Sequence, residues 1–149
     1  MIHYVAVLFT PRSLEYRLVG SIISDLMDGV SGLQVLFKER VVLQANDLRI
    51  FYPKLVCTEH FPWIVSCFTR GYSEFFLMSG HNVHVPINSL KGKFSFDYGN
   101  GSACASGLRR KYRIDTVSFE FLFHSTDSDE ETDVMGERLF PERWQSLKG

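Results

Sequence analysis

The chain has 149 residues, the usual length of one domain, and 45% of them are hydrophobic, enough for one packed core. Charged residues make up 22% and the formal net charge is −1, which excludes a disordered chain and gives no overall attraction to nucleic acid or an anionic membrane. We therefore expect one domain over residues 1–149, with neither nucleic acid nor membrane as a partner.

The cysteines and the start of the chain indicate a cytoplasmic protein. The chain has three cysteines, an odd number without paired spacing, which predicts neither a disulfide framework nor a thiolate zinc site and favours a reducing compartment. Residues 1–9 are apolar but lack a basic leader, so they predict a buried strand and not a signal peptide. No apolar run is long enough to span a bilayer.

The first elements in chain order are a strand and a helix. The apolar run over residues 2–9 predicts a central strand, and Pro11 ends it. Apolar residues at helical spacing from Leu14 to Met27 predict a helix, with Ser13 as its N-cap and Gly29 at its end.

The middle of the chain alternates between strands and short helices. Residues 33–43 and 72–79 predict strands. A short helix is expected over residues 46–52, and a second over 58–69 with Pro62 in its first turn.

The segment from Lys91 to Phe123 predicts β-hairpins. Aromatic and polar residues alternate over residues 94–99, glycine-rich turns follow, and residues 108–113 and 116–123 are expected to pair as strands.

The last segment predicts a helix and a packed tail. Ser128 and Glu131 fit a capping box, Phe140-Pro141 is expected to end this helix, and Trp144 to pack the tail down. The order of elements predicts an α+β domain, an antiparallel sheet with helices on one face and a hairpin insertion before His124.

Two stretches in the first part of the chain carry recognisable motifs. Pro11 precedes Arg17-Leu18-Val19-Gly20-Ser21-Ile22-Ile23, and Gly71 is followed by an apolar strand that ends in Gly80-His81-Asn82-Val83. They resemble motifs of the nucleoside diphosphate kinases. Pro11 corresponds to the proline of Lys-Pro-Asp, and residues 17–23 to the helix start Gly-Leu-Val-Gly-Glu-Ile-Ile. Residues 80–83 correspond to the strand ending Gly-x-Asn-Val.

Two later stretches continue the resemblance in the same order. Leu90-Lys91-Gly92-Lys93-Phe94 is similar to the family's Ile-Arg-Gly-Asp-Phe, and His124-Ser125-Thr126-Asp127-Ser128 to its active-site His-Gly-Ser-Asp-Ser. The histidine pentad is the most specific of the motifs. The collinear match, from about residue 4 to 140, implies a divergent family member with a ferredoxin-like sheet.

The resemblance implies phosphoryl transfer through a histidine. In the family, a histidine takes the γ-phosphoryl group of ATP, bound with Mg²⁺, and passes it to a nucleoside diphosphate. His124 stands in its place, and Thr126, where the family has serine, is expected near the ring. By itself, a histidine at such a strand-to-helix turn is more often a surface or hydrogen-bonded residue that has no chemistry.

Three more residues are expected to bind nucleotide. Tyr52 matches the family tyrosine near the histidine, and Phe61 lies near the phenylalanine that stacks on the base, although both also fit core aromatics. Lys91 stands in for the arginine of Ile-Arg-Gly-Asp-Phe, without its bidentate fork.

Several positions depart from the family pattern. The lysine before the first proline is Thr10, the following aspartate is Arg12, and the asparagine before the histidine is Phe121. Between Val83 and Leu90 the family has a helix and a long loop with an arginine and a threonine that bind phosphate. Here only a few residues remain, including Pro86, so those phosphate ligands are expected to be deleted. The basic cluster over residues 109–113 is either a replacement source of cations or a solvated hairpin tip.

His81 and His84 are spaced like metal ligands, but no carboxylate or thiol lies beside them in the sequence, so no metal site is expected. Two functions remain open. The chain is either a nucleoside diphosphate kinase acting through His124, with nucleotides as partners, or a catalytically degenerate kinase fold that acts as a structural or protein-interaction module, alone or as a homodimer.

Overall fold

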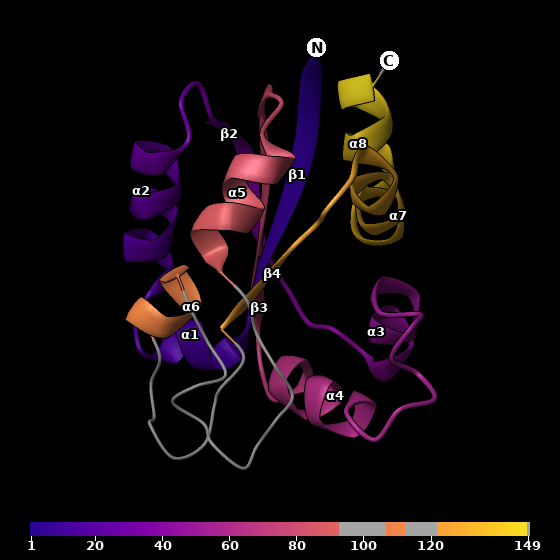
Figure 1. Ribbon diagram of the computed structural model, residues 1–149. Coiled ribbons are helices and arrows are strands. Elements are labelled where there is room, and N and C mark those ends of the chain that lie inside the picture. Colours follow the sequence, from indigo (N-terminus) through magenta and orange to yellow (C-terminus); the bar gives the residue numbers. More distant parts are fainter. Residues whose placement is uncertain (93–106, 113–121, 149) are drawn as a thin grey trace.

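The computed structural model describes residues 1–92, 107–112 and 122–148, and Figure 1 shows their arrangement. Strands and helices alternate along the chain as follows: β1 (Ile2–Phe9), α1 (Pro11–Glu15), α2 (Val19–Gly29), β2 (Gln34–Val41), α3 (Ala45–Phe51), α4 (Phe61–Thr69), β3 (Ser73–His81), α5 (His84–Lys91), α6 (Gly107–Lys111), β4 (Phe123–Ser125), α7 (Asp129–Leu139) and α8 (Pro141–Lys148). None of the described helices is long and apolar enough to cross a bilayer.

The four described strands form one antiparallel sheet in the order β2-β3-β1-β4. β1 lies at its centre, with Val5 opposite Met78 on β3 and Leu8 opposite His124 on β4. This arrangement confirms the predicted α+β class and the antiparallel, ferredoxin-like sheet.

Helices cover both faces of the sheet, so the prediction of helices on one face was wrong (Figure 1). Alternate residues of β1 point to opposite sides because side chains alternate along a strand. Val5 and Val7 pack with α2 and α5, whereas Ala6 and Leu8 pack with α3, α4, α7 and α8. The uninterrupted apolar run from Val5 to Phe9 of β1 is the sequence signal for this arrangement, because a strand buried on both faces shows no polar alternation.

The helix predicted from Ser13 to Gly29 is in fact two helices. Thr10 is the N-cap of α1, and its hydroxyl accepts a hydrogen bond from the backbone N–H of Ser13, which lies buried inside α1. Arg17 adopts a φ of +58° and separates α1 from α2. Regular apolar spacing does not reveal such a break, because the left-handed residue changes the chain direction without interrupting the pattern.

Although short, the segment between Val83 and Leu90 still contains a helix. These residues form α5, with Pro86 in its first turn. Proline is tolerated there because the N–H groups of the first turn have no partner within the helix. Ile87 of α5 packs into the core on the α2 side of the sheet. A helix is therefore present at this place in the chain.

The predicted hairpin insertion is contradicted where the structure describes it. A strand was expected over residues 108–113, but residues 108–111 belong to the short helix α6, which packs on α5 through Leu108. The alternation over residues 94–99 and most of the strand expected over 116–123 lie outside the described residues. Only its end, at Phe123, belongs to a described strand, β4.

The last predicted helix and its ends are confirmed. The Ser128 hydroxyl accepts a hydrogen bond from the Glu131 N–H at 3.2 Å, while the Glu131 carboxylate accepts one from the Asp127 N–H at 2.6 Å. α7 ends before Phe140, and Trp144 on α8 is buried against Tyr4 and Gly136.

Candidate functional site

His124 is the middle residue of β4, which lies at the edge of the sheet. Phe123 belongs to the core on the α2 side, so alternation along the strand turns the half-buried His124 side chain to the opposite face, towards α3 and α7. The strand thereby places this imidazole at the sheet edge, on the face where α3 and α7 pack.

Tyr52 lies against His124. It directly follows α3, and its ring meets the imidazole edge-on, with 4.8 Å between the two ring centroids. Its hydroxyl is buried and has no hydrogen-bond partner among the described residues, and this burial raises the pKa of Tyr52. The sequence-based expectation that Tyr52 lies beside His124 is met by this geometry.

Two cations bind the backbone of β4. The Lys91 ammonium, at the end of α5, donates to the Ser125 hydroxyl at 2.8 Å and lies 3.4 Å from both the Ser125 carbonyl and an Asp127 carboxylate oxygen. The Arg109 guanidinium, from α6, donates to the Phe123 carbonyl at 3.4 Å and lies over the Phe123 ring. Lys91 is only 8% exposed, so both its desolvation and the Arg109 charge lower its pKa.

The imidazole of His124 is neutral at physiological pH. Burial, and then the positive charges of Lys91 and Arg109, lower its pKa to about 3, although Asp127 acts in the opposite direction. A neutral imidazole keeps a free lone pair, which is what a histidine nucleophile requires.

A cavity of about 190 Å³ opens next to His124 on the α3 and α7 side. Its lining is mostly apolar, with two carboxylates from the start of α7: Ile50, Phe51, Pro53, His124, Thr126, Glu130, Glu131, Val134 and Met135. The two carboxylates make this cavity unfavourable for a phosphate group, whereas the positive charges of Lys91 and Arg109 lie outside its lining.

Thr126 and Phe61 occupy structural positions. Thr126 is 1% exposed, and its hydroxyl bonds with the Ala6 N–H at 3.0 Å and the Thr132 hydroxyl at 2.7 Å. Phe61, at the start of α4, is 6% exposed in the core on the α4 and α7 side, and the Arg49 guanidinium lies over its ring. A ring so deeply buried presents little surface for a nucleotide base.

Thr10 and Arg12, which depart from the family pattern, lie at the start of α1. Thr10 is fully buried, and its hydroxyl donates to the Leu122 carbonyl just before β4. Arg12 lies on α1, with its guanidinium 3.4 Å from the Glu15 carboxylate and over the Tyr16 ring. Thr10 therefore serves the backbone of α1 and the start of β4.

Arg109 is the site residue that the motif assignment missed. The basic cluster over residues 109–113 was left open between a source of cations and a solvated tip, and its first member lies against β4. The family motif Ile-Arg-Gly-Asp-Phe was assigned to residues 90–94. Leu108-Arg109-Arg110-Lys111-Tyr112 also has an apolar residue, then a basic one, and an aromatic residue at the fifth position. That second match in the sequence was the signal that could have identified it.

Solved structures share this architecture over nearly the whole chain. The nucleoside diphosphate kinase of Aquifex aeolicus is 15% identical, with a TM-score of 0.74, over 94% of this chain and 96% of that one. The nucleoside diphosphate kinase of Encephalitozoon cuniculi is 18% identical, with a TM-score of 0.76, over 93% of this chain and 88% of that one. The chain therefore has a nucleoside diphosphate kinase-like fold. No family model and no curated protein matches the sequence.

Proposed function

We propose that this protein transfers the γ-phosphoryl group of a nucleoside triphosphate to a nucleoside diphosphate through a phosphohistidine at His124. The observation that carries the proposal is a neutral imidazole on β4, a strand whose neighbouring residues Ser125 and Phe123 are contacted by Lys91 and Arg109. Neutrality supplies the nucleophile, and fixed cations in a poorly hydrated site stabilise the charge of a transferring phosphoryl group.

The proposed reaction has two balanced steps. The His124 lone pair attacks the γ-phosphorus, a nitrogen–phosphorus bond forms, and the bond to the β-phosphate oxygen breaks, releasing the nucleoside diphosphate. A terminal phosphate oxygen of a second nucleoside diphosphate then attacks the phosphohistidine and regenerates the imidazole. Mg²⁺ enters with the triphosphate as part of the substrate and screens its charge.

The side chains around His124 have separate proposed roles. Lys91 and Arg109 face the phosphates, and the unpartnered hydroxyl of Tyr52 donates to the bound nucleotide. Thr126 holds the turn after β4 to β1 through Ala6 and thereby orients the strand that carries His124. We propose no contact between Phe61 and the base.

One observation favours the alternative, a catalytically degenerate fold that serves as a structural or protein-interaction module. Thr10 stands where the family has a phosphate-binding lysine, and its hydroxyl is already used inside the protein. A kinase of this kind would depend on Lys91 and Arg109 to replace that charge.

Nucleotide binding distinguishes the two functions. We expect MgADP to saturate one site per chain in a calorimetric titration, with a dissociation constant between about 1 μM and 1 mM, the usual range for substrates. Arg109→Met should weaken binding by about tenfold or more, because it removes a charge-assisted hydrogen bond worth about 1.5–3 kcal/mol.

The matched control is Arg110→Met, which changes the exposed neighbour on the same short helix and should bind MgADP like the unaltered protein. If the folded, unaltered protein fails to bind MgADP at millimolar concentration, the kinase proposal is wrong and the module is favoured. Equal losses in both variants would instead remove Arg109 from the proposed site.

A further inference from the structure

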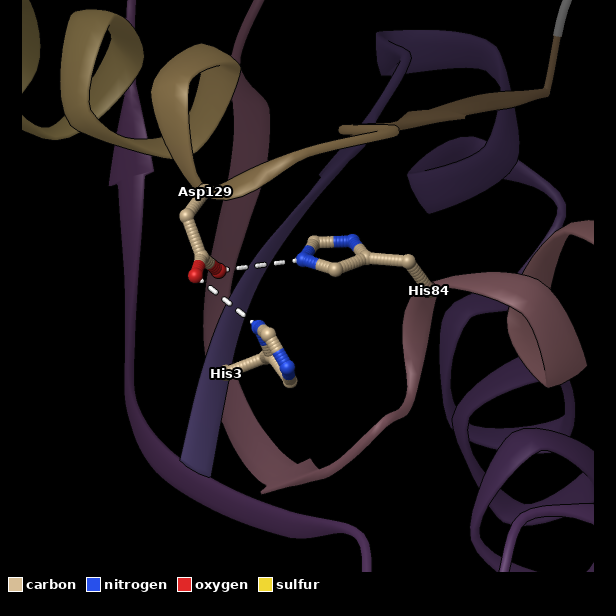
Figure 2. A group of neighbouring side chains, drawn as sticks. All are labelled: His3, His84 and Asp129. Carbon is tan, nitrogen blue, oxygen red and sulfur yellow. Dashed lines mark hydrogen bonds and ion pairs between the residues drawn. The ribbon is translucent and has the colours of Figure 1, made fainter. Parts of the chain in front are cut away.

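Two histidines and an aspartate from three distant parts of the chain meet at one end of the sheet. Figure 2 shows His3 from β1 and His84 from α5 pointing at the carboxylate of Asp129, the first residue of α7. His3 Nδ1 lies 2.9 Å from Asp129 Oδ2, and His84 Nε2 lies 3.1 Å from Asp129 Oδ1. No carboxylate lies near His84 in the sequence, but the fold brings Asp129 next to it.

The spacing of these atoms suits a metal ion. The three potential ligand atoms all lie within 4.8 Å of one another. Around tetrahedral Zn²⁺, with ligand bonds of about 2.0–2.1 Å, neighbouring ligand atoms are roughly 3.3 Å apart. The two histidine–carboxylate separations, 2.9 and 3.1 Å, are close to this value.

The backbone already holds the carboxylate in position. Its Oδ1 accepts a hydrogen bond from the Tyr4 N–H at 3.2 Å, next to His3 on β1. An aspartate coordinates metal ions through its ionised carboxylate, and this one is fixed by the backbone in a position that both imidazoles face.

The cluster is partly open to solvent. The side chains of His3 and His84 are 22% and 14% exposed, whereas that of Asp129 is 43% exposed. The imidazoles are thus largely enclosed by protein, while the carboxylate side is open to solvent. Three protein ligands and a water complete a tetrahedral site.

We propose that His3, His84 and Asp129 form a binding site for one divalent transition-metal ion, with Zn²⁺ as the expected occupant. Two imidazoles and one carboxylate suit Zn²⁺ and its first-row neighbours, whereas Mg²⁺ and Ca²⁺ favour sites made of oxygen ligands. The ion would join β1, α5 and α7 at a point distinct from the phosphate positions proposed around His124, and the proposal does not depend on kinase activity.

The test is metal titration of the full chain without a histidine tag, after treatment with a chelator and in the absence of nucleotide. We expect Zn²⁺ to bind with a stoichiometry of one per chain, and Co²⁺ to give the visible absorption of a nitrogen- and oxygen-ligated ion. Changes in outer-shell partners alone weaken metal binding by about 10- to 100-fold, so Asp129→Asn and His84→Gln, which each remove a ligand, should cost at least about 100-fold.

Matched controls exclude general binding to histidines and thiols. His81→Gln removes a nearby histidine that lies outside the cluster, and Cys57→Ser removes an exposed thiol, so both should bind Zn²⁺ as the unaltered protein does. Circular dichroism checks that each variant is folded. The proposal is overturned by an absence of stoichiometric binding, by full binding in folded Asp129→Asn and His84→Gln, or by a Co²⁺ spectrum dominated by thiolate ligation.

Discussion

At the scale of single residues, the surroundings of His124 combine burial with positive charge, and both act in the same direction. Each disfavours the imidazolium, and the pKa of His124 falls to about 3. The same cations attract a phosphate group. A site for phosphohistidine needs both properties, because the nucleophile must be neutral while its substrate is strongly anionic.

The depressed pKa predicts how stability depends on pH. Unfolding returns His124 to its ordinary pKa of 6.5, so between about pH 6.5 and 3 the unfolded chain binds more protons than the folded one. The contribution of His124 to the free energy of unfolding should therefore decrease as pH falls through this window, by at most about 1.4 kcal/mol per pH unit.

Urea denaturation of the unaltered protein and His124→Gln at pH 7 and pH 4.5 measures this effect. Glutamine does not titrate, so the variant should become relatively more stable at the lower pH. A stability difference between the two proteins that is the same at both pH values would show that the His124 pKa is not depressed.

The sequence allowed part of this site to be predicted. The histidine pentad led to His124, and the resemblance led to Tyr52 beside it. The second match to the arginine motif could have indicated Arg109 as a candidate, but its position against β4 depends on the packing of α6 on α5. The hydrogen bonds of Thr126 and Thr10 within the protein could not be predicted either, because the sequence does not show whether a threonine hydroxyl binds the backbone or a substrate.

At the scale of elements, strands were easier to predict than helix boundaries. β1 and β3 are long apolar runs, and the structure places both at the centre of the sheet. The α1–α2 break at Arg17 and the helices α5 and α6 were missed, because short amphipathic segments resemble loops or strands when tertiary contacts decide their conformation.

The contact between α7 and α8 gives a test at this scale. A Cβ added at Gly136 would lie 2.8 Å from Cδ2 of the buried Trp144, whereas one added at Gly20 on α2 meets nothing within 4 Å. Gly136→Ala should destabilise the protein by about 1–3 kcal/mol through overpacking. Gly20→Ala, the control, should stabilise it by about 0.5–1 kcal/mol, the usual gain for alanine in a helix.

Thermal or urea unfolding followed by circular dichroism measures both changes. If Gly136→Ala were as stable as the unaltered protein, α8 would not pack on α7 through Trp144 as described. A lower stability of Gly20→Ala would indicate that this part of α2 is constrained by something other than helix propensity.

At the scale of the whole molecule, the antiparallel sheet with helices on both faces is shared with nucleoside diphosphate kinases despite an identity of only 15–18%. The class and the sheet were predictable because the order of elements restricts the topology. The second helical layer was not anticipated, because the polar-apolar mixture of α3, α7 and α8 does not show which face of the sheet they cover.

The fold joins residues from distant parts of the chain at two separate places. Lys91 and Arg109 contact the residues on either side of His124 in β4, while His3, His84 and Asp129 meet at the starts of α5 and α7. No local sequence pattern contains either group. Both arise from the closure of the sheet by β4 against β1.

The most direct test of the central claim is incubation of the protein with γ-labelled ATP and Mg²⁺, followed by measurement of label bound to the chain and of its stability in acid. We predict an acid-labile label on the unaltered protein, loss of that label in His124→Ala, and its discharge on addition of a nucleoside diphosphate. A folded protein that takes up no label at high ATP, or a label that persists in His124→Ala, would contradict phosphoryl transfer through His124.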